Sequence, residues 1–109
     1  MTVPDESRFE TEALRLLERW LGAIEDGDRF EAEFESGILT VKSASGGTWV
    51  LNKHAPMRQL WLSSPVSGGS HYALDGASGE WRDTRGGPPL ALRLGAELSA
   101  AAGLPIVLA

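Results

Sequence analysis

The sequence contains no cysteine, and its only histidines are His54 and His71. The lack of cysteine excludes a disulfide framework, a thiol nucleophile, a zinc finger and an iron–sulfur cluster held by the chain itself. Two imidazoles are also too few for a multi-histidine metal site. Thiol catalysis and sulfur-based or histidine-rich metal centres are therefore excluded.

A long hydrophobic run is absent as well. No apolar stretch approaches the ~20 residues of a membrane-spanning helix, and the first residues lack the basic and apolar regions of a secretory signal. We therefore expect a cytoplasmic protein with no membrane partner. A length of 109 residues, 42% hydrophobic and 23% charged, predicts one globular domain over 1–109.

Positive charge is scarce in the first third of the chain. Residues 1–36 contain eleven acids and four bases, whereas residues 37–109 contain four acids and six bases. This asymmetry favours cations or basic partners at the acidic end and disfavours nucleic acid. The alternative interpretation is that the acids only make a first helix and strand soluble.

Apolar residues at three- and four-residue steps predict an amphipathic helix over about Arg8–Glu25. Ser7 and Glu10 have the spacing of a capping box, which indicates the helix start. Asp26-Gly27-Asp28 indicates its end. The predicted buried stripe consists of Phe9, Ala13, Leu16, Leu17, Trp20 and Ile24.

From Phe30 the hydrophobic period changes to two, which is typical of strands with one buried face. In the first of these strands Phe30, Ala32 and Phe34 alternate with three glutamates. Further strands are predicted at 38–42, 48–53, 59–63 and 71–74 and around Trp81. The short turns favour antiparallel pairing, because a parallel return needs a dozen residues or more.

A second helix is predicted to start at Gly86-Gly87-Pro88-Pro89, because proline fits the first turn of a helix, and to end at Gly103. Its buried stripe consists of Leu90, Leu94, Leu98 and Ala102. The apolar tail 104–109 is expected to lie in a groove between the two helices. The predicted fold class is α+β, a two-layer sandwich with the N- and C-terminal helices on one face of a five- or six-stranded antiparallel sheet.

This layout leaves one sheet face uncovered. If Leu60 and Leu62 point inward, Gln59 and Trp61 point outward, and Asn52 points outward on the preceding strand. A tryptophan beside amide side chains has the composition of an interface hot spot. Two other interpretations stay open: the ring lies flat over neighbouring side chains, or the register differs by one residue.

Three segments resemble the frataxin family, including its bacterial members. They are Gly37-Ile-Leu-Thr-Val-Lys42, Gly47-Thr-Trp-Val-Leu-Asn-Lys-His-Ala-Pro56 and, above all, Gln59-Leu-Trp-Leu-Ser-Ser-Pro65. Tyr72, Trp81 and Gly95-Ala-Glu-Leu98 also match, so the similarity covers about residues 9–102. The resemblance implies a frataxin-like α–β sandwich with an acidic ridge on its first helix and first strand.

The resemblance also implies weak binding of Fe²⁺ and Fe³⁺, and docking onto the complex of cysteine desulfurase and scaffold protein that builds iron–sulfur clusters. The metal-binding carboxylates that it implies are Glu18, Glu25, Asp26, Asp28, Glu31 and Glu33. The docking patch that it implies on the sheet consists of Asn52, Gln59 and Trp61. Carboxylates are hard ligands that also take other divalent cations, and spread-out carboxylates leave each ion most of its water. We therefore expect weak, unselective sites.

The sequence lacks a nucleophile–base pair, a phosphate-binding loop and a Glu-x-x-His di-iron motif, so we expect no enzyme activity, although ferroxidase activity is attributed to parts of the family. The leading hypothesis is a monomeric, iron-binding regulator of cluster assembly that acts by protein contact. One alternative is an iron store or chaperone that oligomerises with iron. Another is a binding domain that has lost iron.

The sequence departs from the family pattern at several positions. The ridge is expected to be thinner on the helix, where relatives often carry acids in place of Leu14, Arg15, Arg19 and Gly22. His71 stands where some relatives have arginine, and we interpret it as an ordinary strand-edge residue. We interpret His54 as a surface residue in a loop.

Overall fold

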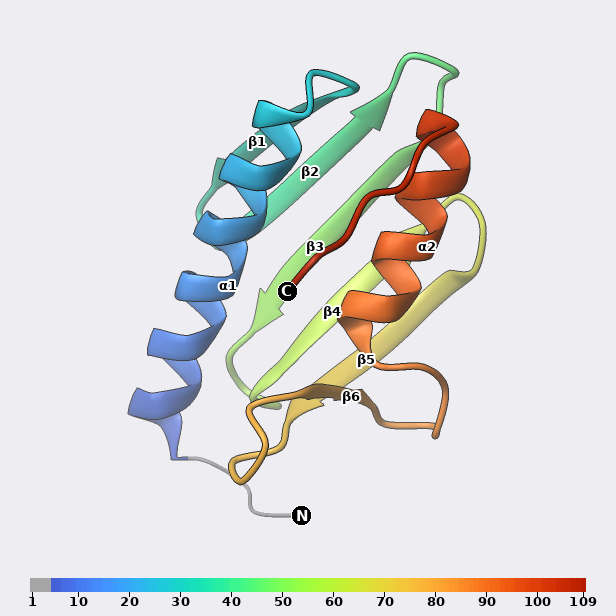
Figure 1. The fold of residues 1–109 in the computed structure, drawn as a ribbon. Helices are drawn as coiled ribbons and strands as arrows, with labels where there is room; N and C mark the ends of the chain where they lie inside the picture. Colours follow the sequence, from blue (N-terminus) through green and yellow to red (C-terminus); the bar gives the residue numbers. More distant parts are fainter. Residues whose placement is uncertain (1–4) are drawn as a thin grey trace.

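The computed structural model describes residues 5–109, so the first four residues of the predicted domain 1–109 lie outside it. Six strands form one antiparallel sheet in the order of the sequence. Two helices lie on one face of this sheet, and no helix of residues 5–109 covers the other (Figure 1). The predicted two-layer α+β sandwich is confirmed, with six strands. The elements are α1 (Glu6–Asp26), β1 (Phe30–Glu35), β2 (Ile38–Ser43), β3 (Thr48–His54), β4 (Gln59–Ser64), β5 (Gly68–Leu74), β6 (Trp81–Asp83) and α2 (Leu90–Ala102).

Helix α1 buries the whole predicted stripe, from Phe9 to Ile24. Its predicted capping box is wrong. The helix starts about half a turn earlier, because the Asp5 carboxylate accepts a hydrogen bond from the backbone N–H of Arg8 at 2.8 Å and so caps the first turn. The Glu10 carboxylate, which the capping box would have used, instead bonds the Lys53 ammonium on β3.

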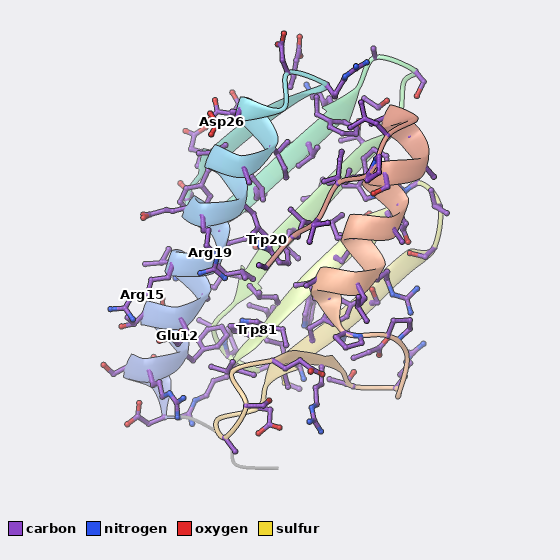
Figure 2. The ribbon with its side chains drawn as sticks, viewed as in Figure 1. Glu12, Arg15, Arg19, Trp20, Asp26 and Trp81 are labelled. Carbon is purple, nitrogen blue, oxygen red and sulfur yellow. The ribbon has the colours of Figure 1, made fainter. Side chains whose placement is uncertain are left out.

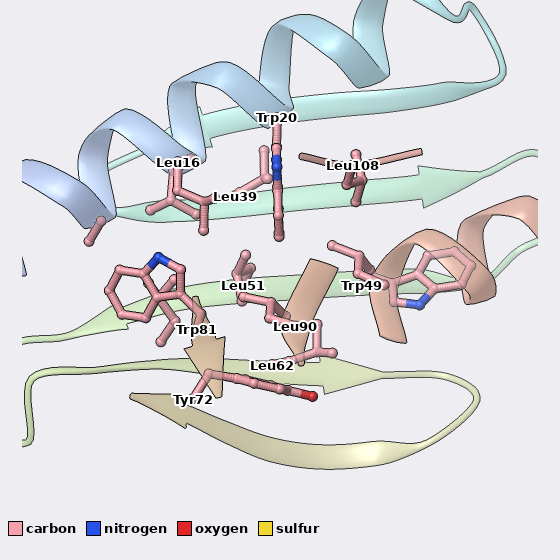
Figure 3. Packing of buried hydrophobic residues seen from close by; sticks show 14 of the residues in the cluster. Leu16, Trp20, Leu39, Trp49, Leu51, Leu62, Tyr72, Trp81, Leu90 and Leu108 are labelled. Carbon is pink, nitrogen blue, oxygen red and sulfur yellow. The ribbon is translucent and has the colours of Figure 1, made fainter. Parts of the chain in front are cut away.

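The sheet places its apolar side chains against the helices by simple alternation. Trp49 and Leu51 on β3 and Leu60 and Leu62 on β4 are all buried, as the sequence predicts. Figure 3 shows residues of β2, β3, β4 and β5 packed together with Trp20 and Trp81 between the layers. The predicted register is therefore confirmed on the covered face.

The C-terminal tail runs between α1 and α2, as expected (Figure 1). Leu108 is 7% exposed and lies near Trp20 in the layer between helices and sheet (Figure 3). The Trp20 indole N–H donates to the backbone oxygen of Ala109 at 3.2 Å, and Arg19 Nε donates to the same oxygen at 2.8 Å. Figure 2 labels both side chains on α1. The tail is therefore bound to α1 by packing and by hydrogen bonds.

Helix α2 binds the other side of the tail. The Ser99 hydroxyl accepts the Ile106 N–H at 2.7 Å. Gly95 is what lets the tail come so close, because a Cβ at this position would stand 3.3 Å from the Ile106 backbone oxygen. The match of Gly95 to the family pattern thus coincides with a close helix–tail contact.

Three details of α2 and the C-terminal tail differ from the sequence prediction. Helix α2 begins at Leu90, with Pro89 as its N-cap rather than in its first turn. Ala102 is only partly buried. Val107 is 86% exposed, because side chains of an extended segment alternate and its neighbour Leu108 points inward. Among residues 5–109, no helix is long and apolar enough to cross a membrane.

Replacing Leu108 by alanine is expected to lower the free energy of unfolding by about 2 kcal/mol, because a buried side chain is lost from the layer between the helices. The neighbouring Val107→Ala change is the matched control and should stay within about 0.5 kcal/mol of the parent. Denaturant unfolding measures both. Equal effects of the two substitutions would show that the tail does not pack as described.

Candidate metal-binding ridge and docking face

The six predicted metal-binding carboxylates are all exposed and lie on two adjoining elements. Helix α1 supplies Glu18, Glu25 and Asp26, the following turn supplies Asp28, and β1 supplies Glu31 and Glu33. Figure 2 shows Asp26 at the end of α1 that leads into β1. We refer to these six residues as the acidic ridge.

The carboxylates of the ridge are spread over the surface and do not converge on one point. Glu25, Asp26 and Asp28 share the helix end and the turn, where Asp28 takes a left-handed φ of 52°. Glu18 lies two turns earlier on α1, about 10 Å from Glu25 along the axis. Among residues 5–109, no group of three or more acidic or histidine side chains is arranged to hold a metal ion. The donor set therefore fits loosely held, hydrated cations and does not fit a tight chelate.

In the described part of the chain, five acids outside the ridge form ion pairs with bases, whereas none of the six ridge acids does. Within residues 5–109, no ion pair shorter than 4 Å involves any of the six ridge carboxylates. The paired acids and their partners are Glu10 with Lys53, Glu12 with Arg15 at 3.3 Å, Asp75 and Glu80 with Arg82 at 3.1 and 3.6 Å, and Asp83 with Arg93 at 3.4 Å. Arg8 and Arg19 bond backbone oxygens instead. The ridge carboxylates therefore carry charge that no ion pair of residues 5–109 neutralises directly.

Asp75, unlike the ridge acids, is buried and is held by hydrogen bonds and an ion pair. Its carboxylate accepts the backbone N–H of Ala77 at 3.0 Å and pairs with Arg82. The hydrogen bond from Ala77, helped by Ser78 and Arg82, holds the pKa of the Asp75 carboxyl below its usual value. Stability from this group is present at neutral pH and is lost as acid protonates the carboxylate.

The helix end adds a further electrostatic cost to the ridge. Glu25 and Asp26 stand in the last turn of α1, which contains no basic residue. The carbonyl end of a helix carries partial negative charge, so carboxylates there are repelled by the helix as well as by one another. A bound cation would relieve both repulsions and so stabilise the folded chain.

A lysine moderates the strand part of the ridge. Glu31 and Lys42 are partners across β1 and β2, and Glu33 faces Thr40. A shallow groove on the uncovered face is lined by these four residues and Ala32. The helix end, around Asp26 and Asp28, is therefore the more negative part of the ridge.

The predicted docking patch lies on the uncovered sheet face. Asn52 and Trp61 are cross-strand partners on β3 and β4, and the Gln59 side-chain oxygen accepts the Trp61 indole N–H at 2.8 Å. All three residues are half-buried, while Leu60 and Leu62 point to the core. The structure therefore brings the three together and rules out the one-residue slip that would bury Trp61.

The structure contradicts the loop position expected for His54 and the strand-edge position expected for His71, while His54 stays partly exposed. His54 belongs to the end of β3 rather than to a loop, and His71 lies on β5, an interior strand between β4 and β6. Their rings stack on opposite sides of the Trp61 indole, with centroid distances of 3.7 and 4.2 Å and interplanar angles of 7° and 6°. Trp61 therefore does not lie flat over its neighbours but stands between two imidazoles. The hairpin register, which pairs Trp61 with His71, is the signal that could have found this contact.

Comparison with known proteins agrees with this architecture. The family model of the frataxin-like domain matches residues 3–104. The chain belongs to the frataxin-like family. The iron-sulfur cluster assembly protein CyaY of Bordetella avium is 41% identical over 107 residues, which cover 89% of this chain and 94% of that protein. Mitochondrial frataxin of Dictyostelium discoideum is 41% identical over 70 residues, which cover 64% of this chain but only 36% of that longer protein.

Solved structures of frataxins share the fold. The frataxin of Psychromonas ingrahamii superposes with a TM-score of 0.85 at 22% identity, over 97% of this chain and 99% of that one. Trimeric frataxin of Saccharomyces cerevisiae, complexed with ferrous iron, superposes with a TM-score of 0.76 at 33% identity, over 84% of this chain and 86% of that one. The sandwich described above is thus the frataxin fold.

Titration with Mn²⁺, a paramagnetic stand-in for Fe²⁺, is expected to broaden backbone NMR signals around 25–28 first and those of Glu31 and Glu33 later, because Lys42 faces the strand part of the ridge. Signals of α2 should keep their intensity. Broadening centred on any other part of the fold would contradict the assignment of the ridge as the metal site.

Proposed function

We propose that this chain is an iron-binding accessory protein of iron–sulfur cluster assembly that docks on the complex of cysteine desulfurase and scaffold protein. The observation that carries the proposal is the unpaired acidic ridge beside an uncovered, Trp61-bearing face. A relative with 41% identity is named an iron-sulfur cluster assembly protein, which supports the same role here. The proposal places the chain in the cytoplasm, without nucleic acid or membrane partners.

Iron is the cargo of the ridge in this proposal. Hard carboxylate oxygens suit Fe³⁺ and, less selectively, Fe²⁺ and other divalent cations. Since the six carboxylates are spread out, an ion keeps most of its water and can leave readily. A yeast relative crystallised with ferrous iron supports iron as the ion.

In this proposal, the acidic ridge supplies the charge for docking and Trp61 supplies the close contact. The ridge attracts a basic partner surface and speeds its approach. Trp61 lies three strands away from β1 on the same uncovered face, about 14 Å across the sheet. One partner can therefore cover both, with the ridge setting orientation and the indole supplying contact energy. This protein acts by contact and performs no covalent step.

A second candidate function is iron storage by self-assembly. The trimeric state of the ferrous yeast frataxin favours it. Light scattering after addition of Fe²⁺ separates the two functions, because storage requires growth in mass with iron, whereas the accessory role requires a monomer that still docks.

Removing ridge charge tests the role of the ridge. The variant Glu25→Gln/Asp26→Asn/Glu31→Gln/Glu33→Gln is expected to be more stable in the absence of metal, because mutual repulsion is gone, and to lose the rise in melting temperature that Fe²⁺ gives the parent. Its affinity for the desulfurase–scaffold complex should fall about tenfold or more at low salt.

The control removes three acids outside the ridge, as Glu6→Gln/Glu12→Gln/Glu80→Gln. This variant should keep both metal stabilisation and docking. If the ridge variant also keeps them, the acids serve only for solubility and the proposal is wrong.

Trp61→Ala is expected to weaken docking by about 2 kcal/mol, the effect of losing an interface hot spot. The free energy of unfolding should fall by only about 1 kcal/mol, since the ring is half-buried and outside the core. Calorimetry on the complex and denaturant unfolding measure the two effects.

The control for Trp61 is Leu92→Ala. Leu92 is 66% exposed on α2, on the far side of the sandwich, and its loss should leave docking unchanged. A larger loss of docking with Leu92→Ala than with Trp61→Ala would place the partner on the helices instead.

A further inference from the structure

The stack of His54, Trp61 and His71 crosses three adjacent strands of the uncovered face. Trp61 and His71 are partners across β4 and β5, and His54 is the partner of Gln59 across β3 and β4. The Trp61 indole thus has an imidazole on each side, at 3.7 and 4.2 Å between ring centroids and nearly parallel to it. The rings whose charge changes near neutral pH are therefore in direct contact with the side chain assigned to docking.

One hydrogen bond holds the ring of His54 in place. The backbone N–H of Met57 points to Nδ1 of His54 at 3.3 Å, so this nitrogen acts as an acceptor. A protonated imidazole donates from both nitrogens and cannot accept this bond. Protonation of His54 therefore removes a contact that fixes its ring beside Trp61.

Two charged imidazoles would also oppose each other across the indole. A single imidazolium over an indole face is attractive by itself. A partner that covers the stack, however, must remove water from every imidazolium in it, which disfavours the charged form. The docked state therefore binds fewer protons than the free state.

The other charged groups near the stack do not offset this effect. On the uncovered face, the neighbouring outward positions of β4 and β5 are the uncharged Gln59, Ser63, Gly69 and Ala73. Lys53 points to the opposite face, where it pairs with Glu10. The other charged residues of these strands and turns include Arg58 in the turn between β3 and β4, Arg82 on β6 beside its partners Asp75 and Glu80, and Arg85 just after β6. Farther across the sheet are Lys42 on β2 and Glu31, Glu33 and Glu35 on β1. Carboxylic acids ordinarily titrate near pH 4, below the range of imidazole.

We propose that the stack makes docking on the uncovered face dependent on pH: the face accepts its partner while His54 and His71 are neutral and releases it as they gain protons. A partner that complements the ridge is basic, so added positive charge on the same face acts in the same direction. This inference rests on the proposed docking function, but the titration of the stack itself can be measured on the free protein.

The first experiment needs no partner. The fluorescence of Trp61 is obtained as the difference between the parent and Trp61→Phe, and it is followed from about pH 7.5 to about pH 5.5, where imidazole gains its proton. A protonated imidazole in contact quenches an excited indole, so the Trp61 emission is expected to fall with acid. The double variant His54→Phe/His71→Phe keeps two rings beside the indole but cannot titrate, and its Trp61 emission, obtained by the same subtraction, should stay constant. An unchanging signal in the parent, or the same fall in the double variant, would overturn the titrating stack.

The second experiment measures docking to the desulfurase–scaffold complex over the same range. Affinity of the parent should fall about tenfold for each imidazole that must stay neutral. Groups on the partner also titrate, but they affect parent and double variant equally. The ratio of the two affinities at each pH cancels this contribution, and the proposal predicts that the ratio falls with acid. A variant with His54→Gln/His71→Gln provides a second non-titrating surface if the phenylalanines promote self-association.

The outcomes separate the two proposals. If the parent docks at about pH 7.5 and the affinity ratio stays constant to about pH 5.5, the proposed function stands and the pH dependence is wrong. If the parent does not dock at either pH, the proposed function and its pH dependence both fail, whatever the fluorescence shows.

Discussion

The alternation of side chains along six antiparallel strands is the constraint on which every other feature of this protein depends. Inward positions such as Leu60 and Leu62 are sealed by two helices and by the tail that runs between them. Outward positions on the same strands carry Trp61 and the glutamates of β1. A slip of one residue would exchange the two sets, so the core and the functional face are fixed by the same register.

Charge is distributed in a way that stability alone would not favour. Acids such as Asp75 and Asp83 are paired with arginines, whereas the ridge has no ion pair within residues 5–109 and ends at the negative pole of α1. Natural proteins keep such local costs where function needs them. Cations or a basic partner would relieve the repulsion among the ridge carboxylates, which explains why the cost is kept. Because the carboxylates are spread out, such binding is weak and reversible.

Most of the architecture could be predicted because it follows from periodicity. The six-residue stripe of α1 and the strand register need only the positions of apolar residues. The helix cap at Asp5 does not follow from the capping-box spacing, because a single aspartate caps a helix without a second side chain, and the structure shows its carboxylate accepting the Arg8 N–H. The apolar composition of the tail predicts burial throughout, whereas its extended geometry turns alternate side chains inward and leaves Val107 exposed.

The pairing of acids with bases could not be predicted from the sequence for a different reason, and the histidine stack was only hinted at by the hairpin register that pairs Trp61 with His71. The ion pair of Glu10 with Lys53 joins residues far apart in the chain, and the stacking of His54 on Trp61 depends on side-chain orientations that the fold sets. The residue type alone does not show whether a carboxylate forms an ion pair or whether an imidazole stacks on an indole. The candidate residues were visible in the sequence, but their pairing required the fold.

Hydrogen exchange of the whole chain, with and without the desulfurase–scaffold complex, tests the central claim most directly. The account predicts slower exchange in segments 25–35 and 50–63, which contain the helix end, β1 and the strands that carry Asn52 and Trp61, with no change in α2 and the tail. Slower exchange in α2 and the tail, with none in β3 and β4, would show that the partner binds the helical layer and would contradict the account.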